Sequence, residues 1–129
     1  NQMDLHELLE NVKFLGRKSG HELAKWVASS CGLVYVSYFE GFGLPVLEGM
    51  MAGVPVITSN VTSMPEVGGD AVIYVDPFDE VSIARGMTRA FSDGENFVKL
   101  GLKQSGKFSW DKSVSELESV ISNVLLHKE

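Results

Sequence analysis

The sequence is short of cysteine, of basic residues and of long apolar runs, and each shortage argues against a class of protein. Cys31 is the single cysteine, so no internal disulfide can form, and we expect a small buried thiol in a reducing compartment. The formal net charge of −6 provides no basic surface for a phosphate backbone, which argues against nucleic acid as a partner. No apolar run approaches the length of about 18 residues that a transmembrane segment needs, and no secretory leader is seen. These features predict a cytoplasmic protein.

The sequence also lacks the residue spacings on which metal sites and hydrolytic centres depend. Its three histidines are scattered, and none stands near a second histidine or a cysteine at a ligand spacing. No arrangement of Ser, His and Asp, or of Cys and His, supports nucleophilic catalysis. We therefore expect no metal and no bound cofactor.

Length and composition fit one globular domain that spans residues 1–129. The chain is 44% hydrophobic and 22% charged. Short apolar segments bounded by Gly, Asn, Asp or Ser predict strands at residues 11–16, 32–37, 54–59 and 71–76. They are almost continuously apolar and alternate with helical patterns, which is typical of parallel strands covered on both faces. The predicted fold is α/β, a Rossmann-like doubly wound parallel sheet.

Helical patterns occupy most of the sequence between and after these strands. They predict helices at residues 20–29, 45–52, 81–91, 95–107 and 112–126. Ser19 and Asp79 are suitable N-caps, and Gly53 stands where a left-handed residue commonly ends a helix. The last helix has an apolar stripe at helical spacing, so we expect it to pack on the domain.

The segment "FEGFGLPVLE" at residues 39–48 follows the second predicted strand, and parallel sheets bind ligands at the carboxyl ends of their strands. Gly41 and Gly43 are expected to adopt positive φ angles and to let the backbone approach a ligand closely. Pro45 suits a first helical turn, so a helix should begin at Leu44 or Pro45. Unpaired backbone N–H groups and the helix dipole favour a phosphate there. The alternative is a turn that serves chain reversal alone.

Two glutamates flank this glycine turn. Glu40 lies on the loop and Glu48 lies inside the following helix, so the loop folds between them. Their carboxylates suit hydrogen bonds to sugar hydroxyls but would repel a bare phosphate, so a ligand carrying both groups, such as a nucleotide sugar, fits better. The alternative is that both are solvated surface acids, with Glu48 stabilising the start of its helix.

Three runs together resemble a known family. They are "FLG" at residues 14–16, "EGFGLPVLEGMMAGVPVITSN" at residues 40–60 and "PEVGGDAVIYVDP" at residues 65–77. In order and spacing this pattern, which extends from residue 11 to residue 110, closely resembles the C-terminal domain of retaining glycosyltransferases of group 1, which have the two-domain GT-B fold and an E-x7-E motif. The resemblance implies transfer of a sugar, as by a hexosyltransferase, from a nucleoside diphosphate to an acceptor hydroxyl with retention of configuration.

The resemblance also implies roles for individual residues, none of which involves a metal. Glu40 matches the glutamate that contacts the donor sugar and is the candidate catalytic residue. Glu48 matches the glutamate that binds the ribose. The remaining candidates bind the donor through the backbone of the turn or line the nucleotide base: Gly41, Phe42, Gly43 and Leu44 in the turn, and Gly16, Arg17 and Lys18 in the earlier loop.

The sequence departs from the family pattern in two respects. Gly49 stands where alanine is common and should cost its helix about 1 kcal/mol. The family also places an arginine and a lysine that neutralise the diphosphate upstream of the matched region, and an acceptor-binding domain before them. We therefore expect a donor-binding domain that is truncated at its N-terminus and inactive alone. The alternative is a non-catalytic nucleotide-sugar-binding module, or one subunit of a split enzyme.

Overall fold

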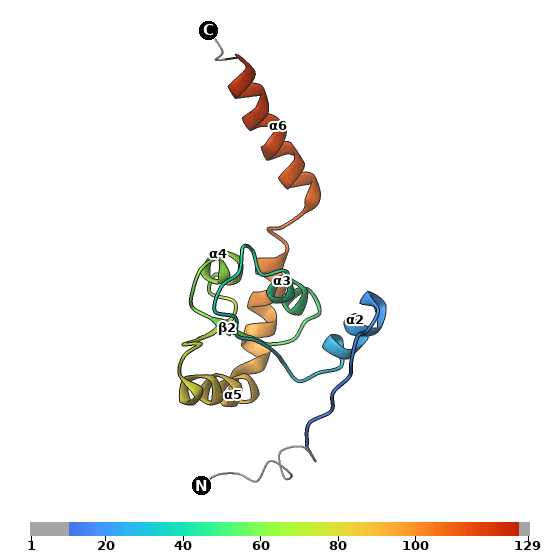
Figure 1. The fold of residues 1–129 in the computed structure, drawn as a ribbon, viewed down its shortest axis with the longest axis vertical. Coiled ribbons are helices and arrows are strands. Elements are labelled where there is room, and N and C mark those ends of the chain that lie inside the picture. The colour runs from blue at the N-terminus through green and yellow to red at the C-terminus, as the bar shows by residue number, and fades with distance from the viewer. Residues whose placement is uncertain (1–10, 127–129) are drawn as a thin grey trace.

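A computed structural model describes residues 11–126, in which a parallel sheet of three strands carries helices on both faces (Figure 1). The strands lie in the order β1-β2-β3, and each consecutive pair is parallel. This arrangement confirms the predicted Rossmann-like α/β fold. The elements follow the order α2 (Gly20–Ala28), β1 (Leu33–Tyr35), α3 (Leu44–Met51), β2 (Val56–Ser59), α4 (Met64–Gly68), β3 (Ile73–Val75), α5 (Glu80–Ser105) and α6 (Trp110–Leu126).

The hydrophobic core has two layers, one on each face of the sheet. Side chains from α3 and α4 form the first layer with β2, and side chains from α5 form the second layer with β2 and β3. Neighbouring residues of β2 divide between the layers, because successive side chains of a strand point to opposite faces. Val56 packs in the first layer and Ile57 in the second. All four residues of β2 are buried, as expected for the central strand.

Two helices approach the sheet so closely that only glycine fits at the contact. A Cβ atom on Gly86 of α5 would lie 2.5 Å from a methyl group of Val75, and one on Gly49 of α3 would lie 2.7 Å from methyl groups of Leu33 and Val56. The sequence shows Gly49 only as a cost to its helix, whereas the structure gives it a packing role.

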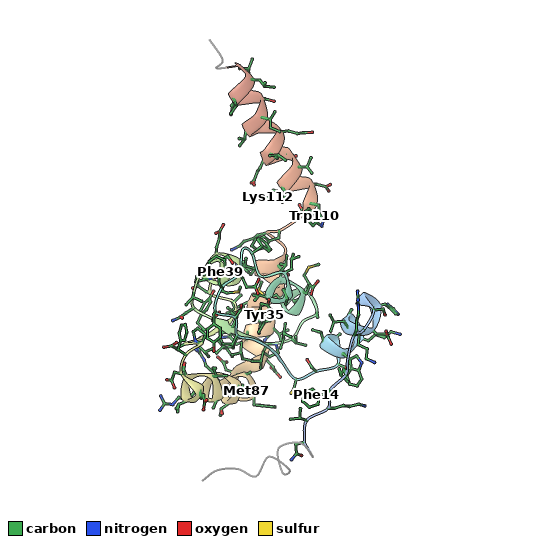
Figure 2. All side chains as sticks on the ribbon, viewed as in Figure 1. Phe14, Tyr35, Phe39, Met87, Trp110 and Lys112 are labelled. Carbon is green, nitrogen blue, oxygen red and sulfur yellow. The ribbon has the colours of Figure 1, made fainter. Side chains whose placement is uncertain are left out.

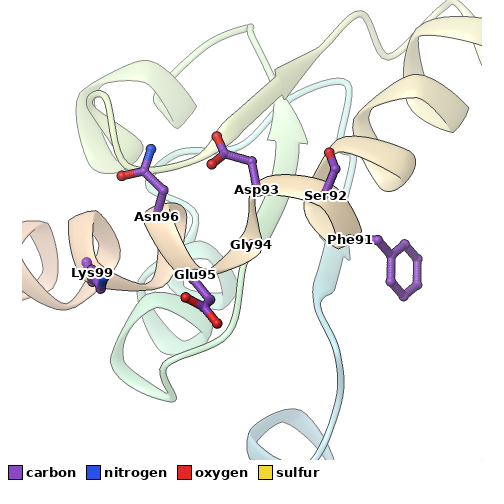
Figure 3. A pocket seen from close by; sticks show the side chains of 7 residues that line it. All are labelled: Phe91, Ser92, Asp93, Gly94, Glu95, Asn96 and Lys99. Atoms are coloured by element: carbon purple, nitrogen blue, oxygen red, sulfur yellow. The ribbon is translucent and has the colours of Figure 1, made fainter.

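Several local predictions are confirmed. Ser19 caps α2 in a capping box with Glu22, and Asp79 caps α5. Gly53 has a φ of +72° after α3. The helices expected at residues 81–91 and 95–107 form the single element α5, which is interrupted at Asp93 by a non-helical φ of −130° and ψ of 18°. Figure 3 shows this kink from Phe91 to Lys99.

The strand predicted at residues 11–16 is wrong, because the structure assigns no strand to this segment. Phe14 is 82% exposed, and the segment pairs with none of β1, β2 and β3. A strand exists through its ladder of hydrogen bonds, so an apolar pattern without a paired neighbour does not form one. The prediction that Cys31 is buried is also wrong, since its side chain is exposed just before β1.

The final helix, α6, does not pack on the domain as predicted. It extends away from the sheet, with its side chains projecting around its whole circumference (Figures 1 and 2). Amphipathic spacing predicts that a helix has an apolar stripe but does not identify the surface that covers it. The side chains of this stripe are 49% to 64% exposed and belong to Val114, Leu117, Val120, Ile121, Val124 and Leu125.

The turn before α3 contains two glycines, of which the backbone requires Gly43 but not Gly41. Gly43 is the N-cap of α3 and has a φ of +99°, in the left-handed region that disfavours other residues. A Cβ atom there would also lie 2.9 Å from the thioether of Met64. Gly41 does not have a positive φ, so this part of the prediction is wrong, and no atom within 4 Å would meet a Cβ there. The helix begins at Leu44, as predicted.

We predict that Gly86→Ala lowers the free energy of unfolding by about 1 kcal/mol. Forcing a methyl group against Val75 costs about 1–3 kcal/mol, which outweighs the gain in helix propensity of about 1 kcal/mol. Urea denaturation of the two proteins measures the difference. Gly20→Ala in α2 is the control, because nothing lies within 4 Å of a Cβ there and only the helix gain applies. Equal stabilisation by both substitutions would contradict the packing role.

We predict that Gly43→Ala destabilises the chain by about 1–2 kcal/mol, because alanine is strained at a positive φ. Gly41→Ala should change the free energy of unfolding by less than about 0.5 kcal/mol, since the position is open. Thermal unfolding followed by circular dichroism compares the two variants. A Gly43→Ala variant as stable as the unchanged chain would contradict the backbone conformation described for this turn.

Candidate functional site

The candidate site lies at the carboxyl ends of the parallel strands, where three loops leave the sheet. The loop after β1 carries Glu40 and the glycine turn, and the loop after β2 leads into α4. The loop after β3 contributes Phe78, whose ring stacks on that of Tyr38 with centroids 4.9 Å apart. Loops that follow β1 and β3 therefore meet at this edge, which is where open α/β sheets bind their ligands.

Glu40 is fixed at its side chain and at both of its backbone polar groups. Tyr35, the last residue of β1, donates a hydrogen bond from its hydroxyl to the Glu40 carboxylate. The backbone N–H of Glu40 donates to Oγ1 of Thr62 at 3.3 Å. The Ser63 hydroxyl lies 3.0 Å from the carbonyl oxygens of both Glu40 and Phe42. The partly buried carboxylate is thus held in one place on the loop.

The bond between Tyr35 and Glu40 perturbs the tyrosine. The pKa of Tyr35 is raised above its ordinary value, first because its hydroxyl donates to Glu40, and then through burial and the negative charge of that carboxylate. A raised pKa means that the neutral hydroxyl, the form able to donate, is the form that the folded chain favours.

The glycine turn presents a run of unpaired backbone donors. Within residues 11–126, the N–H groups of Gly41, Phe42, Gly43 and Leu44 donate no hydrogen bond, and Pro45 has no N–H group. The first bonds of α3 begin beyond this run, with the N–H of Val46 donating to the Gly43 carbonyl at 3.0 Å. Unpaired N–H groups at the start of a helix favour an anion through hydrogen bonds and the helix dipole.

The other predicted site residues lie on separate elements. Glu48 is the fifth residue of α3, and its side chain is exposed. Gly16, Arg17 and Lys18 form an exposed loop before α2, where Gly16 has a φ of +62°. The candidates from Glu40 to Leu44 therefore lie together in the turn before α3. Within the part of the chain that the structure describes, no hydrogen bond or ion pair links this turn to the loop of residues 16–18.

One surface hollow adjoins the glycine turn, and another lies at the opposite edge of the sheet. The first, of about 710 Å³, has an apolar lining from Phe42, Leu44, Leu47, Met51 and Trp110. The second, of about 420 Å³, lies at the kink of α5 and is lined by residues 91–96 and Lys99 (Figure 3). Gly94 of the kink packs by Pro55, which precedes β2, so this second hollow lies at the opposite edge of the sheet from the turn.

The described part of the chain contains neither a cluster of metal ligands nor a membrane-spanning helix. Residues 11–126 hold no group of three His, Cys, Asp or Glu side chains placed to bind a metal ion. None of their helices has the length and apolar character needed to cross a lipid bilayer.

Three residues that contact Glu40 were not predicted from the sequence: Tyr35, Thr62 and Ser63. Tyr35 lies in a predicted strand, where an aromatic residue needs no functional explanation. Thr62 and Ser63 stand 22 and 23 residues after Glu40, and only the folded sheet brings their loop beside the turn. Thr62 has a φ of +53°, which is rare for a β-branched residue, and sequence gives no signal for it.

Comparison with known proteins gives relatives that are much longer than this chain. An O-antigen chain mannosyltransferase B from Escherichia coli is 40% identical over 108 residues, which cover 81% of this chain and 28% of that protein. A D-inositol 3-phosphate glycosyltransferase from Streptomyces bingchenggensis is 30% identical over 119 residues, which cover 88% of this chain and 26% of the relative. The chain therefore spans less than a third of the length of these curated relatives.

A solved structure and a family model cover most of the chain. Sucrose-phosphate synthase from Thermosynechococcus elongatus superimposes on this chain with a TM-score of 0.82 and 24% sequence identity. The match covers 94% of this chain and 32% of the synthase, so the two share a fold. The family model described as glycosyl transferases group 1 matches residues 1–105. With its parallel sheet, its glycine turn and this match, the chain belongs to the glycosyl transferases of group 1.

Proposed function

We propose that this chain is the donor-binding part of a retaining glycosyltransferase, which transfers a sugar from a nucleoside diphosphate to an acceptor hydroxyl. The observation that carries the proposal is the run of four unpaired N–H groups at residues 41–44, directly beside a fixed carboxylate. Amides suit the diphosphate and a carboxylate suits sugar hydroxyls, so the two halves of a nucleotide sugar each find a matching group.

Within this proposal each glutamate acts on a different sugar of the donor. Glu40 contacts the transferred sugar, orients it and stabilises the positive charge that develops at the anomeric carbon as the bond to the diphosphate breaks. Glu48, on the exposed side of α3, hydrogen bonds the ribose hydroxyls. The loop of Gly16, Arg17 and Lys18 lines the nucleotide base. No residue in this scheme requires a metal ion.

We further propose that activity requires an N-terminal domain that binds the acceptor. Support comes from the relatives, of which the chain matches only 26% to 28% of the length, and from the chain's own charge. Arg17 and Lys18 are the cations of the proposed site, and two positive side chains in an exposed loop neutralise a diphosphate weakly. Further cations, and the acceptor site, must then come from protein outside residues 1–129.

The first donors to test follow from the name of the Escherichia coli relative, a mannosyltransferase. We propose nucleoside-diphosphate mannoses with guanine, uracil and adenine bases, compared with the corresponding glucoses. Release of nucleoside diphosphate by the polypeptide that carries this chain, in the presence of a panel of sugar acceptors, identifies the donor and the acceptor together.

We predict that substitutions of the two glutamates separate kcat from KM. Glu40→Ala should lower kcat about 10²–10³-fold, as expected for loss of a group that stabilises the transition state. Glu48→Ala should mainly raise the KM for the donor, by about 10–100-fold, because it removes hydrogen bonds present in both the ground state and the transition state. Steady-state kinetics with the identified donor measure both.

Glu95→Ala is the matched control, since Glu95 is an exposed glutamate at the opposite edge of the sheet. It should leave both constants within about twofold of their original values. Kinetics in which Glu40→Ala and Glu48→Ala behave like Glu95→Ala would exclude both role assignments, and with them the proposed site.

A further inference from the structure

We propose that Tyr35 is a positioning residue for the Glu40 carboxylate, on a loop that Thr62 and Ser63 hold against the neighbouring turn. The inference rests on the proposed function, because it assigns Tyr35 a role in sugar transfer through Glu40. It goes beyond that function by naming three residues outside the E-x7-E segment.

The side chain of Glu40 is held by a residue of the sheet. Tyr35 ends β1, so the position of its ring is set by a strand whose residues pair with β2. Its backbone is held as well, since the buried Thr58 of β2 donates from its hydroxyl to the Tyr35 carbonyl at 2.8 Å. A hydroxyl on a rigid strand therefore reaches a carboxylate on a loop and limits how the carboxylate can turn. Hydrogen bonds to ionised groups are stronger than those between neutral groups.

The backbone around Glu40 is held by the loop between β2 and α4. Thr62 accepts from the Glu40 N–H, and Ser63 bonds the Glu40 and Phe42 carbonyls, so the loop is fixed on either side of the carboxylate. Thr62 does this in a left-handed conformation with a φ of +53°. Strained residues of this kind persist where the surrounding structure requires them, often at functional sites. Here the strain coincides with the side chain that binds the Glu40 amide.

Every one of these contacts is made by the chain's own groups. The protein itself therefore holds the carboxylate beside the four unpaired N–H groups. Preorganised groups stabilise a developing charge without reorganising during the reaction. Removing the Tyr35 hydroxyl should leave the donor able to bind, while the carboxylate loses its fixed orientation.

The first of two measurements uses Tyr35→Phe, which removes only the hydroxyl. In the polypeptide that carries this chain, kcat should fall about tenfold or more, as expected for loss of a charge-assisted hydrogen bond, with the donor KM within about twofold. In a Glu40→Ala background the same substitution should have no further effect, because Tyr35 acts through Glu40. Tyr74→Phe is the control, since its hydroxyl donates to the Gly69 carbonyl at 2.8 Å and not to Glu40.

The second measurement is made on the polypeptide that carries this chain and needs no substrate. NMR titration of tyrosines labelled at Cζ should show the Tyr35 pKa above its ordinary value, and Glu40→Ala should lower it. An unchanged Tyr35 titration in the Glu40→Ala chain would overturn the contact itself.

The kinetic outcomes separate the two proposals. If Glu40→Ala abolishes turnover and Tyr35→Phe does not reduce kcat, the positioning role is wrong and the proposed function stands. An additive effect of Tyr35→Phe in the Glu40→Ala background would likewise overturn action through Glu40. If Glu40→Ala itself leaves turnover unchanged, the proposed function is wrong and the positioning role fails with it.

Discussion

The site depends on hydrogen bonds from hydroxyl side chains that attach the loop after β1 to the loop after β2. Thr62 and Ser63, in the loop between β2 and α4, bond the backbone on both sides of the Glu40 carboxylate, and Tyr35 bonds the carboxylate itself. These bonds satisfy the polar groups of residue 40 and leave the N–H groups of residues 41–44 unpaired. The loop thereby presents acceptors and donors side by side.

The parallel sheet makes this attachment possible. Successive parallel strands end at the same edge, so the loop after β1 and the loop after β2 become neighbours although 22 residues separate Glu40 from Thr62. Buried hydroxyls at the end of β2 strengthen the same edge, since Ser59 donates to the Ser37 carbonyl at 2.6 Å. Close packing of α3 and α5 at glycine contacts places both helices directly against the sheet that carries this edge.

Helix caps and three of the four strands were predicted from the sequence, whereas the partners of two apolar segments were not. The caps at Ser19 and Asp79 and the helix start at Leu44 depend on a few adjacent residues, which is why the sequence reveals them. The segment at residues 11–16 and the apolar stripe of α6 have the right patterns, but a strand needs a ladder and a helix face needs a surface. The glycine turn was predicted from the local sequence "EGFGLP". The contacts of Thr62 and Ser63 with Glu40 form only when β2 lies beside β1.

The central claim is that the backbone of residues 41–44 forms a ready-made site for a diphosphate. Titration of the ¹⁵N-labelled polypeptide that carries this chain with UDP, GDP and ADP, followed by amide NMR spectra, tests it most directly. The account predicts that at least one nucleotide shifts the amide signals of residues 41–44, with those of Glu48 changing in parallel and those at the kink of α5 unaffected. Spectra in which all three nucleotides leave residues 41–44 unchanged at millimolar concentration would contradict it.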